Sequence, residues 1–175
     1  MSYYHYFTTE IRFPYYTKKE EIEPIFSDLL KFYGKASFDE ENTVDDVTIV
    51  LTEYPEGYHR WTPDCPPVVR IEAQGEISSD VENVLQTTAE RLSESNCARC
   101  LGRCFVLTNA DTMTKIRIPI ARKPRDRKNA ILMSCLDDFM SEISGLLAPA
   151  KHEELHVAMR SACLEATSPR KRITH

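Results

Sequence analysis

The chain has 175 residues, of which 42% are hydrophobic and 28% are charged, and its formal net charge is −5. These values are ordinary for a single globular domain and exclude wholesale disorder, collagen and a coiled-coil rod. The acidic balance also argues against general nucleic-acid binding, which usually shows a basic footprint.

No targeting or membrane segment is recognisable in the sequence. The longest apolar run, residues 47–51, is far shorter than the roughly 20 residues that span a bilayer. Residues 1–6 have neither a basic start nor an apolar stretch, so we expect a soluble cytoplasmic protein with no membrane partner. Six cysteines in such a chain indicate reduced thiols, buried residues or metal ligands rather than a disulfide framework.

Hydrophobic periodicity divides the chain into strand-like and helix-like segments. The strand-like segments are rich in β-branched and aromatic residues, and some of them alternate polar with apolar positions. The helix-like segments repeat apolar residues every three or four positions. In chain order we expect a strand over 3–13, a helix over 17–34, strands over 47–53 and 68–77, a helix beginning at Ser79, strands over 104–108 and 115–121, and helices over 131–147 and 151–166.

The first helix carries a proline in its expected interior. Thr17 with Glu20 resembles a capping box, in which two side chains satisfy backbone N–H groups at the helix start. Pro24 would then interrupt the helix, because proline lacks the N–H that an interior turn requires. We therefore expect the regular helix to begin near Glu21, with Pro24 in its first turn.

The order of the elements predicts an α+β fold. The first six follow the β-α-β-β-α-β pattern of a ferredoxin-like antiparallel sheet, to which an extra strand is added. We expect residues 1–122 to form this core with the added strand. Residues 129–166 hold the strongest helical periodicity and are expected to form a C-terminal helical hairpin packed on the same domain. Residues 167–175 are expected to form a loose tail.

Charge is unevenly distributed along the chain. Residues 1–100 hold 9 Lys and Arg against 19 Asp and Glu, whereas residues 101–175 hold 13 against 8. The basic excess falls mainly in 115–128 and indicates either a dipolar surface or a basic loop that grips a phosphate backbone or an acidic partner. The candidate partner-binding residues of this loop are Arg122, Lys123, Arg125, Arg127 and Lys128.

A second candidate contact lies in the Pro-rich connection 55–67. Tyr58, Arg60 and the only tryptophan, Trp61, stand close together there. These three residue types dominate binding hot spots. The alternative is that Trp61 folds back over the core, because long connections are either functional or packed.

Cysteines provide the first metal-type signal. Cys97 and Cys100 have the spacing at which two thiolates hold one Zn²⁺, but a closed tetrahedral site needs four ligands. Cys104 could be the third ligand and Cys65 the fourth. The alternative is a set of ordinary cysteines, because no second pair of this spacing exists. We therefore expect no cofactor, with zinc as the alternative.

Residues 152–156 match the H-E-x-x-H pattern of zinc hydrolases. On a helix, His152 and His156 share one face and can ligate one metal, while Glu153 polarises a water molecule. Cys163 falls on the same stripe and could add a ligand. The alternative is an amphipathic helix whose histidines border the core, and the charged Glu154 inside the motif favours it.

Together these patterns favour a non-enzymatic binding module, an adaptor or inhibitor that occupies the surface of a protein or ribonucleoprotein partner. This interpretation assigns no catalytic residue. Small acidic domains of this type are common among phage and mobile-element proteins that block a host machine, and a host-blocking protein is an interpretation by that analogy alone, carried by no particular residue. The first alternative is a zinc-dependent hydrolase with Glu153 as its base. The second is an RNA-binding protein that uses residues 115–128.

Overall fold

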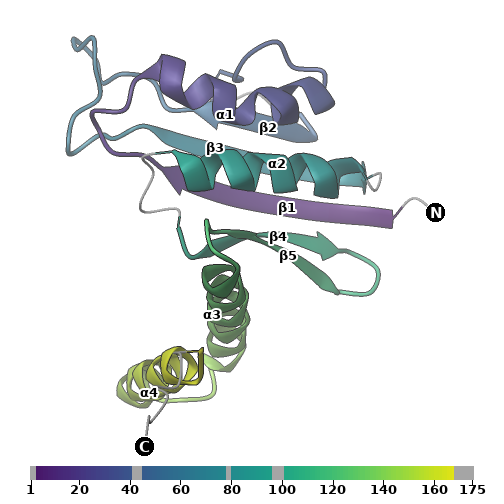
Figure 1. Cartoon of the computed structure of the whole chain (residues 1–175), viewed down its shortest axis with the longest axis vertical. Helices are drawn as coiled ribbons and strands as arrows, with labels where there is room; N and C mark the ends of the chain where they lie inside the picture. Colours follow the sequence, from purple (N-terminus) through teal and green to yellow (C-terminus); the bar gives the residue numbers. More distant parts are fainter. Residues whose placement is uncertain (1–2, 41–44, 78–79, 96–100, 168–175) are drawn as a thin grey trace, which may run out of the picture.

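The computed structural model describes residues 3–40, 45–77, 80–95 and 101–167. These residues form an α+β structure with a five-stranded antiparallel sheet and four helices, so the predicted α+β class is confirmed (Figure 1). The elements are β1 (Tyr3–Arg12), α1 (Lys19–Phe32), β2 (Val47–Leu51), β3 (Val68–Ile77), α2 (Asp80–Glu94), β4 (Arg103–Asn109), β5 (Lys115–Ile120), α3 (Pro124–Ile143) and α4 (Pro149–Thr167).

The sheet has the strand order β2-β3-β1-β4-β5. β1 lies at its centre and pairs with β3 over ten residues, from Tyr3↔Ile77 to Arg12↔Val68. β4 and β5 form a hairpin whose turn is built on Asn109, because its side-chain oxygen accepts hydrogen bonds from the backbone N–H groups of Asp111 and Thr112, both at 2.9 Å. Such a local side-chain bond stabilises a turn in place of the strand ladder.

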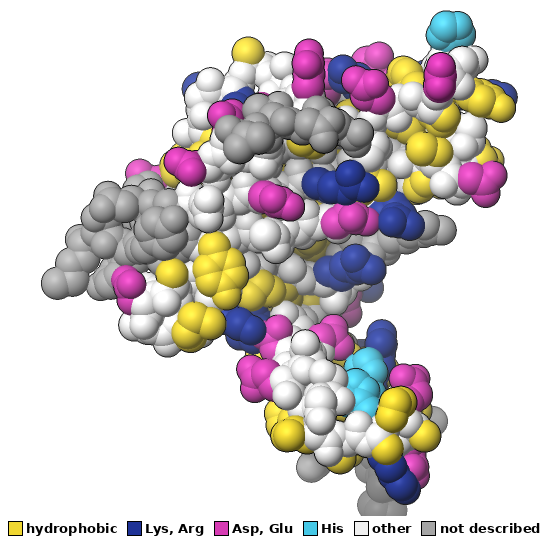
Figure 2. All heavy atoms as spheres, turned by 180° about the vertical axis from the view of Figure 1, so that it is seen from behind, with side chains coloured by type: hydrophobic (Ala, Val, Ile, Leu, Met, Phe, Trp, Pro, Cys, Tyr) yellow, Lys and Arg dark blue, Asp and Glu magenta, His cyan; other side chains and the backbone are white. Residues whose placement is uncertain are grey.

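One face of the sheet carries the core. Strand residues that alternate in sequence, such as Phe7 and Ile11 of β1, point to this face and are buried under α1 and α2, which both lie on it (Figure 1). Phe7 packs edge-on against Phe105 of β4, with ring centroids 5.7 Å apart. The opposite face is polar: Figure 2 shows Lys and Arg side chains among acidic ones on the side that α1 and α2 leave open.

The start of α1 differs from the prediction. The helix begins at Lys19, and the Glu21 carboxylate accepts a hydrogen bond from the Lys18 backbone N–H at 2.9 Å, so the capping residues are shifted by one position from those predicted. Pro24 lies inside the helix and not in its first turn. Its carbonyl accepts a hydrogen bond from Arg91 of α2 at 2.9 Å, which ties this site to the neighbouring helix.

The third helix also begins earlier than predicted. Its first residue is Pro124, so residues 124–128 belong to the helix. The prediction of a basic loop over these residues was therefore wrong. Proline suits the first position of a helix, because the N–H it lacks has no partner there and its φ is already helical. Pro149 likewise begins α4, whereas the sequence predicted only a break at this residue.

The last two helices form a unit at one edge of the sheet. α3 packs against β4 and β5, and α4 packs across α3, so the pair extends away from the sheet (Figure 1). α3 buries only Ala130, Leu136 and Met140, and no side chain described in α4 is fully buried. The helical pair therefore leaves several large apolar side chains exposed.

Candidate binding surfaces

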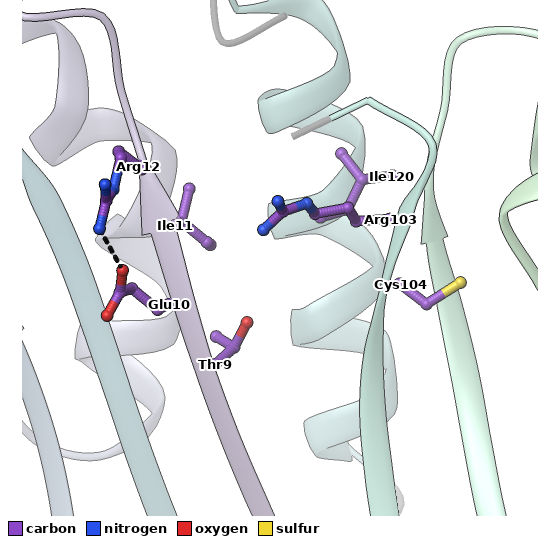
Figure 3. Close-up of a pocket in the computed structure, with 7 residues that line it drawn as sticks. All are labelled: Thr9, Glu10, Ile11, Arg12, Arg103, Cys104 and Ile120. Atoms are coloured by element: carbon purple, nitrogen blue, oxygen red, sulfur yellow. Dashed lines mark hydrogen bonds and ion pairs between the residues drawn. The ribbon is translucent and has the colours of Figure 1, made fainter. Parts of the chain in front are cut away.

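β1 and β4 separate along most of their length. Their ladder consists of His5↔Asn109 and Tyr6↔Thr108, although β1 continues to Arg12 and β4 begins at Arg103. A cleft of about 560 Å³ follows, which we call the β1–β4 cleft (Figure 3). It is lined by Thr9, Glu10, Ile11, Arg12, Arg103, Cys104 and Ile120. Beyond Tyr6, β1 therefore has a described ladder partner on its β3 side only.

On its other side, β4 is held by β5 along its length. β4 pairs with β5 along its length, from Arg103↔Ile120 to Thr108↔Lys115. Gly102, at a φ of 83°, leads into the strand and donates its N–H to the Ile120 carbonyl at 3.0 Å. A positive φ is readily available to glycine, so the chain can turn sharply there. The start of β4 is therefore held against β5, while its described ladder with β1 is limited to the two pairs at its other end.

The cleft is lined by both apolar and charged side chains. Its apolar lining residues Ile11 and Ile120 are only 4% and 2% exposed. Arg103 is exposed, and Figure 3 shows its guanidinium pointing from β4 toward β1. Glu10 lies 3.0 Å from Arg12 Nη2 and 3.5 Å from Arg70 Nε, so its charge is already compensated. Arg103 forms no ion pair within the described part of the chain, so no described side chain neutralises its charge.

Sequence analysis missed this cleft. Neither Arg103 nor the Thr9–Arg12 end of the first strand was among the candidate residues. The patterns of β1 and β4 are ordinary strand patterns, and they contain no signal for how many residues of each strand pair with the other. The nearest sequence signal is Gly102 directly before the strand, which indicates a turn but not a gap.

A charged cluster anchors the helical pair to the sheet. Asp138 of α3 accepts hydrogen bonds from Lys115 Nζ, at 3.0 Å, and from Arg117, both on β5. Arg117 Nε also donates to Ser134 Oγ at 3.3 Å. Partial burial disfavours the carboxylate, but the hydrogen bonds and positive charges of Lys115 and Arg117 outweigh it and lower the pKa of Asp138. The orientation of α3 therefore depends on a carboxylate that stays ionised.

Apolar side chains remain exposed along both helices. Figure 2 shows several of them at the surface of the pair, beside His and charged side chains. The apolar periodicity of α3 predicted a buried helix face, yet only part of that face meets the sheet or α4. The large apolar residues exposed here are Ile131 (37%), Phe139 (44%), Leu146 (80%), Val157 (60%) and Leu164 (46%).

The predicted basic contact segment has partly structural roles. Arg122 donates to the backbone carbonyls of Ser93 and Ser95, the latter at 3.2 Å, and so caps the end of α2. Arg127 Nε donates to the carbonyl of Ala121 at 3.4 Å. The other members, Lys123, Arg125 and Lys128, are exposed. Partner binding by this segment stays a prediction.

Trp61 packs onto the core, which is the alternative predicted for the connection 55–67. It is 4% exposed, its Nε1 donates to the Thr52 carbonyl at 3.1 Å, and its ring lies 4.6 Å from that of Tyr54. Tyr58 and Arg60 are exposed on the same connection. The structure therefore separates the three predicted contact residues into one core residue and two surface residues.

The predicted cysteine site lies largely outside the described residues, because it includes Cys97 and Cys100. Cys104 is half-buried on β4, and burial raises the pKa of its thiol to about 11. Cys65 is exposed in the connection before β3. Within the residues that the structure describes, no three His, Cys, Asp or Glu side chains are grouped to hold a metal. Zinc binding by this set stays a prediction.

The histidines of the H-E-x-x-H segment face α3. His152 Nε2 lies 2.7 Å from the carbonyl of Met140 and must be the donor, because a carbonyl only accepts. His156 Nε2 lies 3.4 Å from an Asp137 carboxylate oxygen. Glu153 is exposed and Cys163 is half-buried on the same helix. These contacts give both histidines a packing role, and the zinc-hydrolase alternative stays a prediction.

Comparisons with known proteins give no information about function. No family model matches the chain, and no curated protein or solved structure was found to match it. No helix within the described ranges has both the length and the apolar character needed to cross a bilayer.

Proposed function

We propose that this protein is a non-enzymatic binding module that accepts an extended segment of a partner protein in the β1–β4 cleft. The early end of the β1–β4 ladder, after Tyr6↔Thr108, carries the proposal. A peptide in the cleft would run along the edges of two strands that each pair on one side only. In strand addition of this kind, main-chain hydrogen bonds supply affinity and side-chain pockets supply specificity.

The charge of the cleft indicates which class of peptide segment would bind there. Arg103 projects into the cleft without an ion pair among the described residues, whereas Glu10 is compensated by Arg12 and Arg70. An acidic side chain on the bound segment would pair with Arg103 as it enters the cleft. The partner is therefore a protein, alone or within a ribonucleoprotein, and the module acts as an adaptor or an inhibitor by covering that segment.

A finer description of the fold belongs to this proposal. β1, α1, β2, β3, α2 and β4 would form a ferredoxin-like unit, with β5 as the strand added beside β4. The order β2-β3-β1-β4 and the position of α1 and α2 on one face support it. In this arrangement the cleft lies inside the unit, between its strands β1 and β4.

The experiment selects linear peptides of about 12 residues from a displayed library on the full-length protein, a length that covers a strand of ordinary size. We expect acidic sequences of high β propensity. Affinity for the wild type is then compared with that for Arg103→Glu, which should bind about tenfold or more weakly through loss of a charge-assisted bond. Arg125→Glu, an exposed cation on α3, has the same charge change and serves as the matched control.

Hydrogen exchange locates the peptide independently of the variants. Binding should slow exchange of the backbone amides of Thr8 and Glu10, which point to the open edge of β1, whereas the alternate amides already face β3. Two results contradict the proposal: equal losses of affinity in the Arg103 and Arg125 variants, or protection that spares β1 and β4. Equal losses would show that the affinity follows the overall charge of the protein and not a contact with Arg103.

A further inference from the structure

α3 carries an apolar ridge that the other described elements cover only in part. Ile131, Cys135, Phe139 and Ile143 follow one another at a spacing of four, which places them along one side of the helix. Ile131 and Phe139 are 37% and 44% exposed, Cys135 is exposed and Ile143 is half-buried. The four residues extend over about 18 Å of helix. We call this set the α3 ridge.

The sequence around the α3 ridge is symmetric about Cys135. Ile131 and Phe139 each lie four residues from it, and Lys128 and Glu142 each lie seven residues from it. At the angular step of an α-helix, these five residues fall within an arc of about 80°. Lys128 and Glu142 are exposed, so the ridge has a cation on one side of Cys135 and an anion at the equivalent position on the other.

We propose that two copies of this chain pair through their α3 ridges, antiparallel, about a twofold axis at Cys135. Ile131 then packs against Phe139 of the second copy, and Lys128 lies opposite Glu142 of the second copy. A twofold interface requires this reciprocity, in which each contact occurs twice. The small cysteine side chain at the axis lets the two helices approach closely.

The opposite charges select a second copy over an unrelated apolar helix. An antiparallel neighbour with the same sequence places a negative charge opposite Lys128 and a positive charge opposite Glu142, whereas a parallel copy in register would oppose like charges. The ridge is also accessible. α4 packs on another side of α3, through His152 at the Met140 carbonyl and His156 near Asp137, and the helical pair extends away from the sheet (Figure 1).

Sedimentation of the full chain between about 1 and 100 µM tests self-association, because dimerisation depends on protomer concentration. We expect a monomer–dimer equilibrium that Ile131→Glu and Phe139→Glu each shift at least tenfold toward monomer. Val157→Glu is the matched control, since it places the same charge at a 60% exposed apolar position of α4, outside the ridge. A monomer throughout this range, or a dimer that all three variants leave unchanged, overturns the proposal.

A charge exchange tests the antiparallel register. Lys128→Glu and Glu142→Lys should each weaken the dimer about tenfold, because each places like charges opposite each other twice. The double variant Lys128→Glu/Glu142→Lys should restore the wild-type constant, since both pairs then form with reversed polarity. Weak dimers in all three variants would overturn the register.

The twofold axis itself is tested by thiol oxidation. Diamide oxidises two neighbouring thiols to one disulfide, so the wild-type dimer should cross-link through the two Cys135 side chains. Cys135→Ser should abolish the cross-linked dimer, whereas Cys65→Ser, at another exposed cysteine, should retain it. Cross-linking that depends on Cys65 and not on Cys135 contradicts the axis.

Discussion

Replacing Asp138 by Asn is the most informative test of how the helical pair is held on the sheet. The substitution keeps the size and hydrogen-bonding shape of the side chain but removes its charge. Asp138 is 30% exposed and bonds to Lys115 at 3.0 Å and to Arg117, so the change leaves two cations facing a neutral amide. The expected effect is a lower free energy of unfolding together with looser attachment of α3.

The magnitude follows from the two hydrogen bonds. A bond to a charged group contributes about 1.5–3 kcal/mol, whereas a neutral bond contributes about 0.5–1.5 kcal/mol. Losing the charge therefore costs about 1 kcal/mol for each bond. Because the side chains of the cluster are 17–30% exposed, solvent screens part of this difference. We expect the free energy of unfolding at neutral pH to fall by about 1–2 kcal/mol.

The dependence on pH separates this electrostatic effect from a packing effect. The pKa of Asp138 is lowered in the folded state, so its contribution to stability is complete above its unfolded pKa, near 4, and is lost as the pH falls through the folded value. In urea titrations followed by circular dichroism, the gap between wild type and Asp138→Asn should be constant above about pH 5 and should narrow below about pH 4.

The neighbouring acid provides the control for the same charge change. Asp137→Asn alters a carboxylate whose side chain is 67% exposed and whose contact is His156 at 3.4 Å, so it should cost less than about 0.5 kcal/mol. Equal losses in the two variants, or an Asp138→Asn deficit that persists unchanged at low pH, would refute the electrostatic account of the anchor.

Two further predictions concern single side chains. Arg122→Ala should reduce the free energy of unfolding, measured by urea denaturation, by about 1–2 kcal/mol, because it removes the cap on the carbonyls that end α2. The control is Lys123→Ala, at the next exposed cation, which should change the free energy of unfolding by less than about 0.5 kcal/mol. Iodoacetamide at pH 8 should label Cys104 on the order of 100-fold more slowly than free cysteine, because the thiol pKa of about 11 leaves little thiolate. Cys65, which is exposed, should label readily. Peptide mass spectrometry measures both labelling rates, and fast labelling of Cys104 would contradict its burial.

The sequence predicted the type and order of the elements because each has a strong local pattern. Alternation of apolar residues defines β3, for example, where Val69, Ile71 and Ala73 are all buried. Helix boundaries were predicted less well. Proline was interpreted mainly as a break, whereas Pro124 and Pro149 each occupy the first position of a helix and Pro24 lies inside one. A single proline has several permitted positions, and tertiary contacts select among them.

The candidate sites were harder to predict, because they depend on pairing across long stretches of chain. Nothing in the residues of β1 or β4 sets where their ladder ends. β4 is instead held to β5, and β5 to Asp138 of α3, by contacts between segments far apart in the chain. The roles of Arg122 and Trp61 could not be predicted from the sequence either. The residue type is the same whether a side chain caps a distant helix, packs under a loop or binds a partner.

The β1–β4 cleft and the α3 ridge have different proposed roles, and single substitutions can test each of them separately. If two copies join through α3, each dimer carries two β1–β4 clefts in a fixed arrangement, because Asp138 ties α3 to β5 and thereby to β4. A partner with two acidic segments would then bind both clefts, and the second contact would form at an effective concentration in the millimolar range. Ile131→Glu lies outside the cleft, so it should leave the affinity for a single peptide unchanged and reduce the affinity for a tandem peptide. Loss of both affinities would show that the cleft depends on the dimer for its shape.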